Sequence, residues 1–324
     1  MKNFNKNFLM KNKNLKIFFL CVFFLLFSPL PSIFAQKSNS ASTLTKKPAY
    51  KNLGFPEINN AAVKELRTKY LTTHKDWLYK TLEEGLQYRI FIRNELEKKK
   101  MPAILEYLPL VESDYNPYAK SRSGATGLWQ FMLNSIHGLL EYNEYVDERL
   151  DPWKSTEAAL KKLNENYKTF GDWLLAITAY NCGAGALKKA IKKAGSHDFW
   201  YLRDNGFLSA QASSYVPKLL AVADVVENDK YYGVNFPQGR AWNGTTLETR
   251  AGIFDYVTVY DSVYLDSISH ELRIDKEELY NLNSALIKHV TPPYKKYTLR
   301  FPEGMQHSAS YALEQMGYLT KTEQ

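Results

Sequence analysis

Apolar residues recur at spacings of three and four over residues 57–100, and this periodicity restricts the fold more than any other feature. Val63, Leu66 and Tyr70 begin the repeat, which continues through later leucines and isoleucines up to Ile92. An apolar stripe at this spacing is typical of amphipathic helices that pack on a core. No run of alternating apolar and polar residues, the pattern of a strand, occurs between 57 and 230. The chain is therefore predicted to be mainly α.

Turn-forming residues divide this region into separate helices. Pro102 favours a helix start, whereas the Asn-Pro and Ser-Gly pairs after Glu112 indicate a loop over 114–126. Ser155 is a candidate N-cap, and Pro217 is expected at the start of the last helix. The predicted helices span 103–113, 127–140, 155–170, 173–180, 186–193 and 213–226.

The pattern changes after about residue 240. Residues 256–260 and 297–301 are rich in β-branched and aromatic side chains, which predicts two strands. Between them, 265–272 and 276–282 have the apolar spacing of short helices. The sequence therefore predicts a small β-α-α-β module that follows the helical region.

The first 35 residues have the pattern of a secretory signal. Five lysines precede an unbroken apolar run over 17–27, and Ala35 supplies a small residue for cleavage. The run is short for a bilayer span, so an uncleaved anchor is the second alternative. Cys21 has no small residue before it, and a lipoprotein is not expected. We therefore predict export to the periplasm or cell envelope.

Removal of the signal leaves 37 basic and 34 acidic residues, a net charge of +3. This balance gives no reason to expect nucleic acid as a partner. Cys182 is the only cysteine outside the signal, so no intrachain disulfide is expected. The sequence shows neither metal-ligand spacing nor a glycine-rich phosphate loop, and neither a metal nor a cofactor is predicted.

Glu112 is the strongest catalytic candidate because it ends the apolar run Leu108-Pro109-Leu110-Val111. A carboxyl group in apolar surroundings is costly to ionise, so its pKa is expected to rise. Such a group can hold a proton near neutral pH and donate it to the leaving oxygen of a sugar–sugar bond. Asp114 is the second carboxylate to consider. It lies two residues after Glu112, so the two side chains would point to different sides of the helix end, and Asp114 is interpreted as a turn former.

Three segments resemble the lytic transglycosylases of the bacterial cell wall. They are Glu112-Ser113, the run Ser-Gly-Ala-Thr-Gly-Leu-Trp-Gln over 123–130, and Ala179-Tyr180-Asn181. The resemblance covers about 95–230. The run before Glu112 and the C-terminal module are similar to the membrane-bound lytic murein transglycosylase D branch. That module resembles a degenerate LysM module, because Asp261-Ser262-Val263 stands where a Gly-Asp-Thr turn is usual.

The resemblance implies a lysozyme-like (goose-type) helical domain and a role for each matching residue. Glu112 would be the sole catalytic acid and base, and Tyr180 would hold it or the substrate. Trp129 and Phe131 are expected in the core. The implied substrate-binding residues are Ser121, Gly127, Gln130, Asn181 and, through ring stacking, Tyr115, with Tyr118 as a further stacking candidate.

The predicted function is non-hydrolytic cleavage of the bond between N-acetylmuramic acid and N-acetylglucosamine, which leaves 1,6-anhydro ends. A lysozyme-like hydrolase and an inactive wall-binding protein remain as alternatives. The expected partners are peptidoglycan glycan strands, with cell-wall assembly proteins as further candidates, and the chain is expected to be a monomer. The predicted parts are a signal (1–35), a linker (36–56), a helical segment (57–100), a catalytic domain (101–235), a LysM-like module (250–305) and a tail (306–324).

Overall fold

The structure is a computed structural model that describes residues 48–238 and 253–319. The predicted signal and most of the predicted linker lie outside the described residues. No described helix is both long and apolar enough to cross a membrane.

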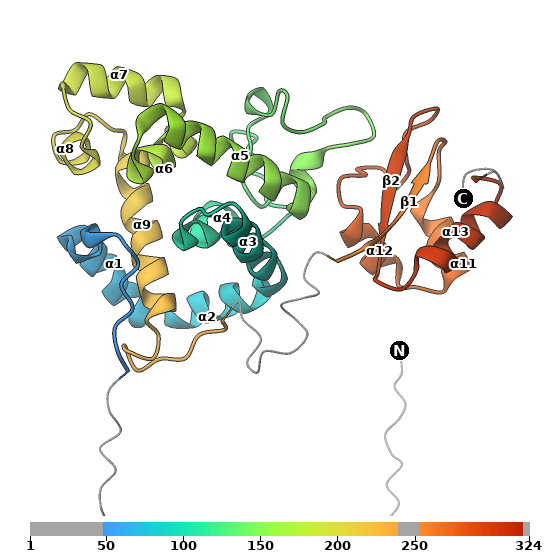
Figure 1. Cartoon of the computed structure of the whole chain (residues 1–324), viewed down its shortest axis with the longest axis horizontal. Coiled ribbons are helices and arrows are strands. Elements are labelled where there is room, and N and C mark those ends of the chain that lie inside the picture. Colours follow the sequence, from blue (N-terminus) through green and yellow to red (C-terminus); the bar gives the residue numbers. More distant parts are fainter. Residues whose placement is uncertain (1–47, 239–252, 320–324) are drawn as a thin grey trace, which may run out of the picture. The chain divides into compact units, whose positions relative to one another are not determined.

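The helical region, 56–227, contains nine α-helices among its described residues (Figure 1). They are α1 (Ala61–Leu71), α2 (Lys75–Glu84), α3 (Leu86–Lys98), α4 (Leu108–Ser113), α5 (Pro152–Phe170), α6 (Trp173–Cys182), α7 (Ala184–Ala194), α8 (Phe199–Asp204) and α9 (Ala210–Glu227). Four short 3-10 helices join them, namely η1 (Pro56–Asn59), η2 (Ala103–Tyr107), η3 (Leu133–Ser135) and η4 (Glu148–Leu150). The mainly α prediction is confirmed.

The long helix α5 shows how local sequence sets the helix ends. Asp151, rather than the predicted Ser155, is the N-cap, because its carboxylate accepts hydrogen bonds from the backbone N–H groups of Trp153 and Lys154. Pro152 occupies the first turn, where no N–H is needed. At the other end Gly171 adopts a φ of 70°, a left-handed conformation that favours glycine.

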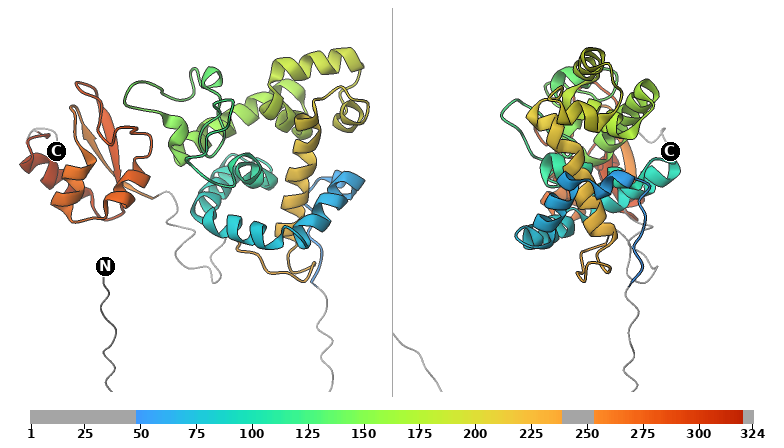
Figure 2. Two further views of the ribbon diagram at one scale, coloured as in Figure 1. Left: turned by 180° about the vertical axis from the view of Figure 1, so that it is seen from behind. Right: turned by 90° about the vertical axis from the view of Figure 1, so that its left-hand side faces the viewer.

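Helix α9 packs against α1, α6 and η2 (Figures 1 and 2). It begins at Ala210, three residues earlier than predicted, so Pro217 lies inside the helix. Proline removes the hydrogen bond to the carbonyl four residues earlier. The Ser213 carbonyl is nevertheless satisfied, because Arg203 Nε donates to it at 3.2 Å. The helix therefore continues through the proline.

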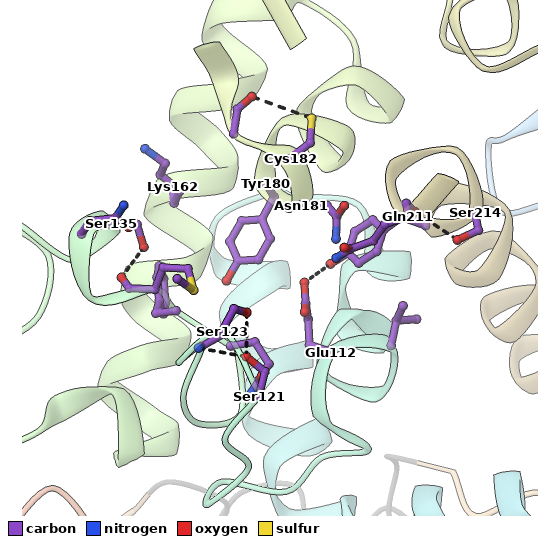
Figure 3. A pocket seen from close by; sticks show the side chains of 18 of the residues that line it. Glu112, Ser121, Ser123, Ser135, Lys162, Tyr180, Asn181, Cys182, Gln211 and Ser214 are labelled. Carbon is purple, nitrogen blue, oxygen red and sulfur yellow. Dashed lines mark hydrogen bonds between the residues drawn. The ribbon is translucent and has the colours of Figure 1, made fainter. Parts of the chain in front are cut away.

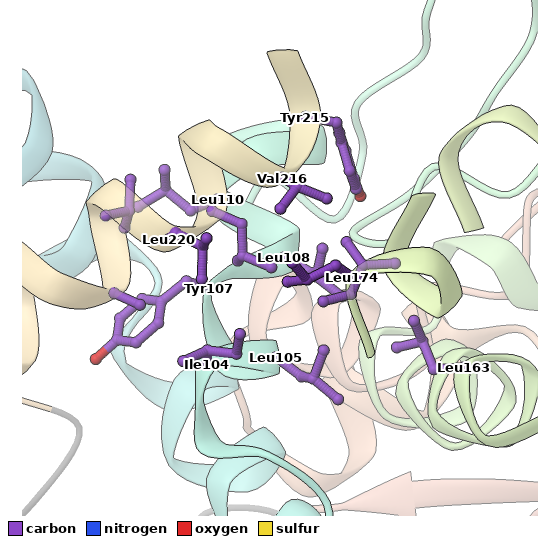
Figure 4. Close-up of a cluster of buried hydrophobic side chains, with 14 of the residues drawn as sticks. Ile104, Leu105, Tyr107, Leu108, Leu110, Leu163, Leu174, Tyr215, Val216 and Leu220 are labelled. Atoms are coloured by element: carbon purple, nitrogen blue, oxygen red, sulfur yellow. The ribbon is translucent and has the colours of Figure 1, made fainter. Parts of the chain in front are cut away.

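Apolar side chains from α4, α5, α6 and α9 form the core beneath the cavity described below (Figure 4). Leu108 and Leu110 of α4 are almost fully buried, as are Leu174 of α6 and Val216 of α9. Trp129 and Phe131 also belong to this core, as predicted. Burial of these groups fixes the short helix α4 in the molecule.

A buried ion-pair network joins α3 and η2 to α9. Glu106 is fully buried and accepts from Arg89 Nε at 2.9 Å and from Arg93 Nε. Arg93 also pairs with Glu227 of α9, with 2.6 Å between Nη2 and Oε1. Loss of one partner from such a network leaves an uncompensated buried charge. The network therefore holds the segment before α4 in one position.

The start of the described chain packs on α9 and is not a free linker. Tyr50 Oη donates to Asp224 Oδ1 at 2.5 Å, and the Lys51 backbone N–H donates to Asn228 Oδ1 at 2.6 Å. Leu53 and Phe55 pack against the apolar core. The predicted linker over 36–56 is therefore wrong for its last residues.

The predicted helix over 127–140 is also wrong. This stretch contains only η3, and its remainder forms turns and isolated bridges such as Thr126 with Phe131. Gly127, Gln130 and Gly138 adopt positive φ values of 84°, 48° and 71°, which no right-handed helix allows. The chain here forms a looped wall in place of a helix.

The C-terminal module contains β1 (Asp255–Val259), α11 (Leu265–Leu272), α12 (Lys276–Leu282), β2 (Tyr297–Phe301) and α13 (Gln306–Gln315). The strands are antiparallel, with Val257 opposite Leu299, and the β-α-α-β prediction is confirmed. Ala309 and Leu313 of α13 are buried in the module's own core. The residues after 305 were predicted as a tail, but the module includes this further helix.

Candidate active site

A cavity of about 650 Å³ opens beside the C-terminal end of α4. Its walls come from α4, the loop over 121–135, α5, the end of α6 and the start of α9 (Figure 3). The lining residues are Val111, Glu112, Ser121, Ser123, Ala125, Gln130, Phe131, Met132, Asn134, Ser135, Lys162, Tyr180, Asn181, Cys182, Gly183, Gln211, Ser214, Tyr215 and Lys218.

Glu112 reaches this cavity from the last turn of α4. The helix is anchored by buried leucines and ends at Asp114, which adopts a left-handed φ of 54°. Burial away from water raises the pKa of Glu112 to about 7, although a hydrogen bond from Tyr215 acts in the opposite direction. The carboxyl group therefore carries a proton for a large share of the time near neutral pH, as the apolar sequence around it predicts.

Tyr215 is the direct partner of Glu112 and was not among the residues predicted for the site. Its hydroxyl donates to Glu112 Oε1 at 2.5 Å. The ring is only 4% exposed, and burial holds the pKa of the phenol well above its usual value, so the phenol keeps its proton. The available signal was a polar stripe on the otherwise apolar helix α9, formed by Gln211, Ser214, Tyr215 and Lys218 at helical spacing.

Tyr180 of α6 forms a wall of the cavity, but its hydroxyl does not bond Glu112. It donates to the backbone carbonyl of Trp129 at 2.9 Å. Its ring meets Trp129 and Phe131 edge to face, with centroids 6.4 and 6.0 Å apart. Tyr180 therefore ties the looped wall to α6, and burial holds the pKa of its phenol well above the usual value.

Ser121 and Gln130 both line the cavity, as predicted for substrate-binding residues. Ser121 Oγ accepts from the Ala125 N–H at 3.0 Å and contacts Ser123 Oγ at 3.1 Å. Gln130 Nε2 donates to the carbonyls of Ala119 and Gly127, at 3.1 and 2.9 Å. The amide nitrogen of Gln130 thus stabilises the loop through two hydrogen bonds. Asn181, at the end of α6, also lines the cavity, beside Cys182.

Gly127 does not line the cavity, and its role differs from the predicted contact with substrate. A Cβ at this position would lie 1.8 Å from the carbonyl oxygen of Arg149, and its φ is 84°. Arg149 in turn pairs with Asp147 through two hydrogen bonds of 2.9 and 2.8 Å and donates to the carbonyls of Gly124 and Phe131. Gly127 is required by this internal packing of the loop.

Tyr115 does not stack on a ligand in the cavity, which corrects its predicted role. It is 2% exposed, and its hydroxyl donates to the Glu106 carbonyl at 2.9 Å. The ring covers Gly85 so closely that a Cβ there would lie 2.4 Å from it. Tyr118 is half exposed, but it is also absent from the cavity lining.

Among the residues that the structure describes, Glu112 is the only acidic one that lines this cavity, and Asp114 is outside the lining. Within residues 48–238 and 253–319, no group of three or more His, Cys, Asp or Glu side chains could hold a metal ion. The site therefore combines one acid of raised pKa with hydroxyl and amide groups and with two lysines, Lys162 and Lys218. Such a set can protonate a leaving oxygen and bind a polar ring system.

Comparison with known protein families identifies two domains. Residues 89–202 match the transglycosylase SLT domain, and residues 253–318 match the LysM-like domain of lytic transglycosylase MltD. The helical region thus contains a lysozyme-like SLT domain, and the C-terminal module is of the MltD LysM-like type. Both matches agree with the resemblance seen in the sequence.

Similar proteins occur in two strains of Escherichia coli and in Alteromonas. The chain is 38% identical over 206 residues to the membrane-bound lytic murein transglycosylase D of strain K12 and to that of strain O6:H1. The match covers 61% of this chain but only 42% of either relative, so the chain spans less than half of their length. A protein of Alteromonas sp. (strain M-1) named for tributyltin chloride resistance is 39% identical over 106 residues, which is 32% of this chain and 51% of that relative.

Proposed function

We propose that this chain, with its SLT domain and MltD-type LysM-like domain, is a lytic transglycosylase of peptidoglycan. The observation that carries the proposal is the position of Glu112 at the floor of the cavity, with a pKa near 7 and no second carboxylate in the lining. The names of the Escherichia coli relatives, which describe murein transglycosylases, support the same substrate.

In the proposed first step, protonated Glu112 donates its proton to the oxygen between N-acetylmuramic acid and N-acetylglucosamine. The bond from that oxygen to the muramyl anomeric carbon breaks, and positive charge develops on the sugar. Most glycosidases place a second carboxylate at this point. Here the acetamido group of the substrate would stabilise the charged centre, because the cavity lining offers no second acid.

In the second step, ionised Glu112 takes the proton from the muramyl 6-hydroxyl as that oxygen attacks the anomeric carbon. The product is a 1,6-anhydro ring, the acid regains its proton, and no water is consumed. Tyr215 would hold the carboxyl group in place during both steps, since its hydroxyl already contacts Oε1. A single group that acts first as acid and then as base works best with a pKa near the operating pH.

The remaining lining residues would bind the sugar rings. Ser121, Asn181 and the carbonyl oxygen of the Gln130 side chain are the proposed contacts to sugar hydroxyl and acetamido groups. Tyr180 would act as a wall of the site. We place the enzyme in the cell envelope as an exported protein, in keeping with the signal-like pattern before Ala35 and with the murein named for its relatives.

The substitution Glu112→Gln tests the role of the acid. The variant should lose glycan cleavage by at least about a thousandfold while it still sediments with isolated cell walls, because only the transferable proton is removed. Tyr118→Phe, outside the cavity, is the matched control and should keep its activity. Full cleavage by Glu112→Gln would exclude this mechanism. Wall binding without cleavage by the unsubstituted protein would favour the inactive wall-binding alternative.

A further inference from the structure

The charges that line the cavity are unevenly distributed. Of the described residues that line it, Glu112 is the only acid, whereas two are lysines, Lys162 on α5 and Lys218 on α9. Neither lysine forms an ion pair with a residue of 48–238 or 253–319. Other cationic groups of the helical region, such as Arg89 and Arg149, have carboxylate partners. The cavity therefore has a net positive charge whenever Glu112 is protonated.

The two lysines approach the cavity from different walls. Lys218 belongs to the polar stripe of α9 and follows Tyr215, the partner of Glu112, by three residues, which is about 4.5 Å along a helix axis. Lys162 comes from α5, and Figure 3 shows it beside Ser135, on the other side of Tyr180 from Ser214. A ligand that fills the cavity would therefore meet one ammonium group near the acid and one at a distance from it.

Neutral sugars do not require these charges. The lining already contains hydroxyl and amide groups from Ser121, Ser135 and Asn181, which suit the hydroxyl and acetamido groups of a glycan. An unpaired ammonium group adds attraction only for an anion. Both lysines are accessible to solvent, because Lys162 is half-buried and Lys218 is exposed. An anion that binds there would replace water and would not break an existing ion pair.

We propose that Lys162 and Lys218 bind carboxylates carried by the muramyl residues, so that the preferred substrate is an anionic glycan strand rather than a neutral one. This inference rests on the proposed function, because it assigns a substrate class to the same cavity. The carboxylate can come from the lactyl group of a muramyl residue without a peptide, or from a stem peptide attached there. Each solvent-exposed contact should strengthen binding about two- to fivefold, and the pair on the order of tenfold.

The inference is tested by measuring the binding of glycans to the full chain that carries Glu112→Gln, because this variant should bind the ligand without cleaving it. Three glycans of equal length serve as probes: a neutral N-acetylglucosamine oligomer, a muramyl-containing glycan with free lactyl carboxylates, and the same glycan with stem peptides. Calorimetric titrations at low and at physiological salt give the affinities. Lys162→Gln/Lys218→Gln is the test variant. Lys161→Gln/Lys168→Gln is the matched control, since both control lysines lie on α5, are exposed and do not line the cavity.

The expected result is a preference of about tenfold for an anionic glycan over the neutral oligomer, which weakens with salt. The test variant should lose this preference, and the control variant should keep it. A preference for the lactyl glycan would identify the lactyl carboxylate as the ligand, whereas a preference confined to the peptide-bearing glycan would identify the stem peptide. Equal affinity for all three probes, or an unchanged preference in the test variant, would overturn the inference.

The result is separable from the proposed function. Charge selectivity in the Glu112→Gln protein, together with no cleavage by the unsubstituted chain, would retain the two-lysine site and reject the enzyme. Cleavage by the unsubstituted chain without charge selectivity in the binding assay would retain the enzyme and reject the two-lysine site.

Discussion

The substitution Tyr215→Phe should move the alkaline limit of activity to higher pH. The Tyr215 hydroxyl donates to Glu112 Oε1 at 2.5 Å and stabilises the ionised carboxylate more than the neutral acid. Its removal leaves the burial of Glu112 in place, so the pKa of the acid should rise from its value of about 7. Activity that needs protonated Glu112 would then persist to higher pH.

The size of this shift follows from the strength of the bond. A hydrogen bond to a charged group contributes about 1.5–3 kcal/mol, and one pKa unit corresponds to about 1.4 kcal/mol. Water from the open cavity can replace part of the lost bond, which favours the lower half of the range. We therefore expect a shift of about one unit, to about 8. The value of kcat/KM on the acidic plateau of the pH profile should fall on the order of tenfold, because the carboxyl group is no longer held in position.

The assay is the pH dependence of kcat/KM on soluble glycan strands, measured from about pH 5 to about pH 9, since this profile reports groups of the free enzyme. Tyr180→Phe is the control, because the Tyr180 hydroxyl donates to Trp129 and not to Glu112. It should reduce stability by about 1 kcal/mol and shift the alkaline limit much less. An unchanged limit in Tyr215→Phe, or one at lower pH, would refute the reasoning.

Three further predictions concern stability and packing. Glu112→Gln should be more stable than the unsubstituted protein above about pH 7. The native glutamate costs no stability below its ordinary pKa of 4.5, because both the folded and the unfolded protein then hold the proton. Its cost grows as pH rises from about 4.5 to the folded pKa of about 7 and reaches about 3 kcal/mol, which denaturant titrations at several pH values would measure. Gly127→Ala should lower the free energy of unfolding by more than about 2 kcal/mol, because the new Cβ would overlap the Arg149 carbonyl. Gly124 has a similar φ of 88° but open space around it, so Gly124→Ala should lower the free energy of unfolding by only about 1 kcal/mol. Equal losses in the two glycine variants would contradict the packing argument. Tyr115→Phe should lose about 1 kcal/mol of stability with the hydrogen bond to the Glu106 carbonyl, and unchanged stability in denaturant titrations would contradict this structural role.

The parts of the fold that follow from hydrophobic periodicity could be predicted from the sequence. The two strands of the C-terminal module appear within one residue of the predicted ranges, and the helices between them have the predicted bounds. These elements are short and amphipathic, and each buries one face, so local pattern and final packing agree. The environment of Glu112 could be anticipated for the same reason, since the apolar residues before it are buried beneath the cavity.

Features that depend on particular three-dimensional contacts, rather than on local hydrophobic pattern, could not be predicted. Residues 127–140 were predicted to be helical from their composition. They form a loop instead, which is stabilised by Arg149, whose guanidinium group donates hydrogen bonds to the carbonyls of Gly124 and Phe131. Tyr115 was misread because its partner, the Glu106 carbonyl, can be located only in three dimensions. Tyr215 lies 103 residues after Glu112, and only the packing of α9 on α4 brings its hydroxyl to the acid.

The most direct test of the central claim, cleavage by one carboxyl group without water, is a digest of purified peptidoglycan in water enriched in heavy oxygen. The products are read by mass spectrometry. The mechanism predicts 1,6-anhydro-muramyl ends that contain no heavy oxygen, because the muramyl 6-hydroxyl and not a solvent molecule attacks the anomeric carbon. Reducing ends that carry heavy oxygen would contradict it and would indicate a hydrolase that positions water without a second acid in the cavity lining.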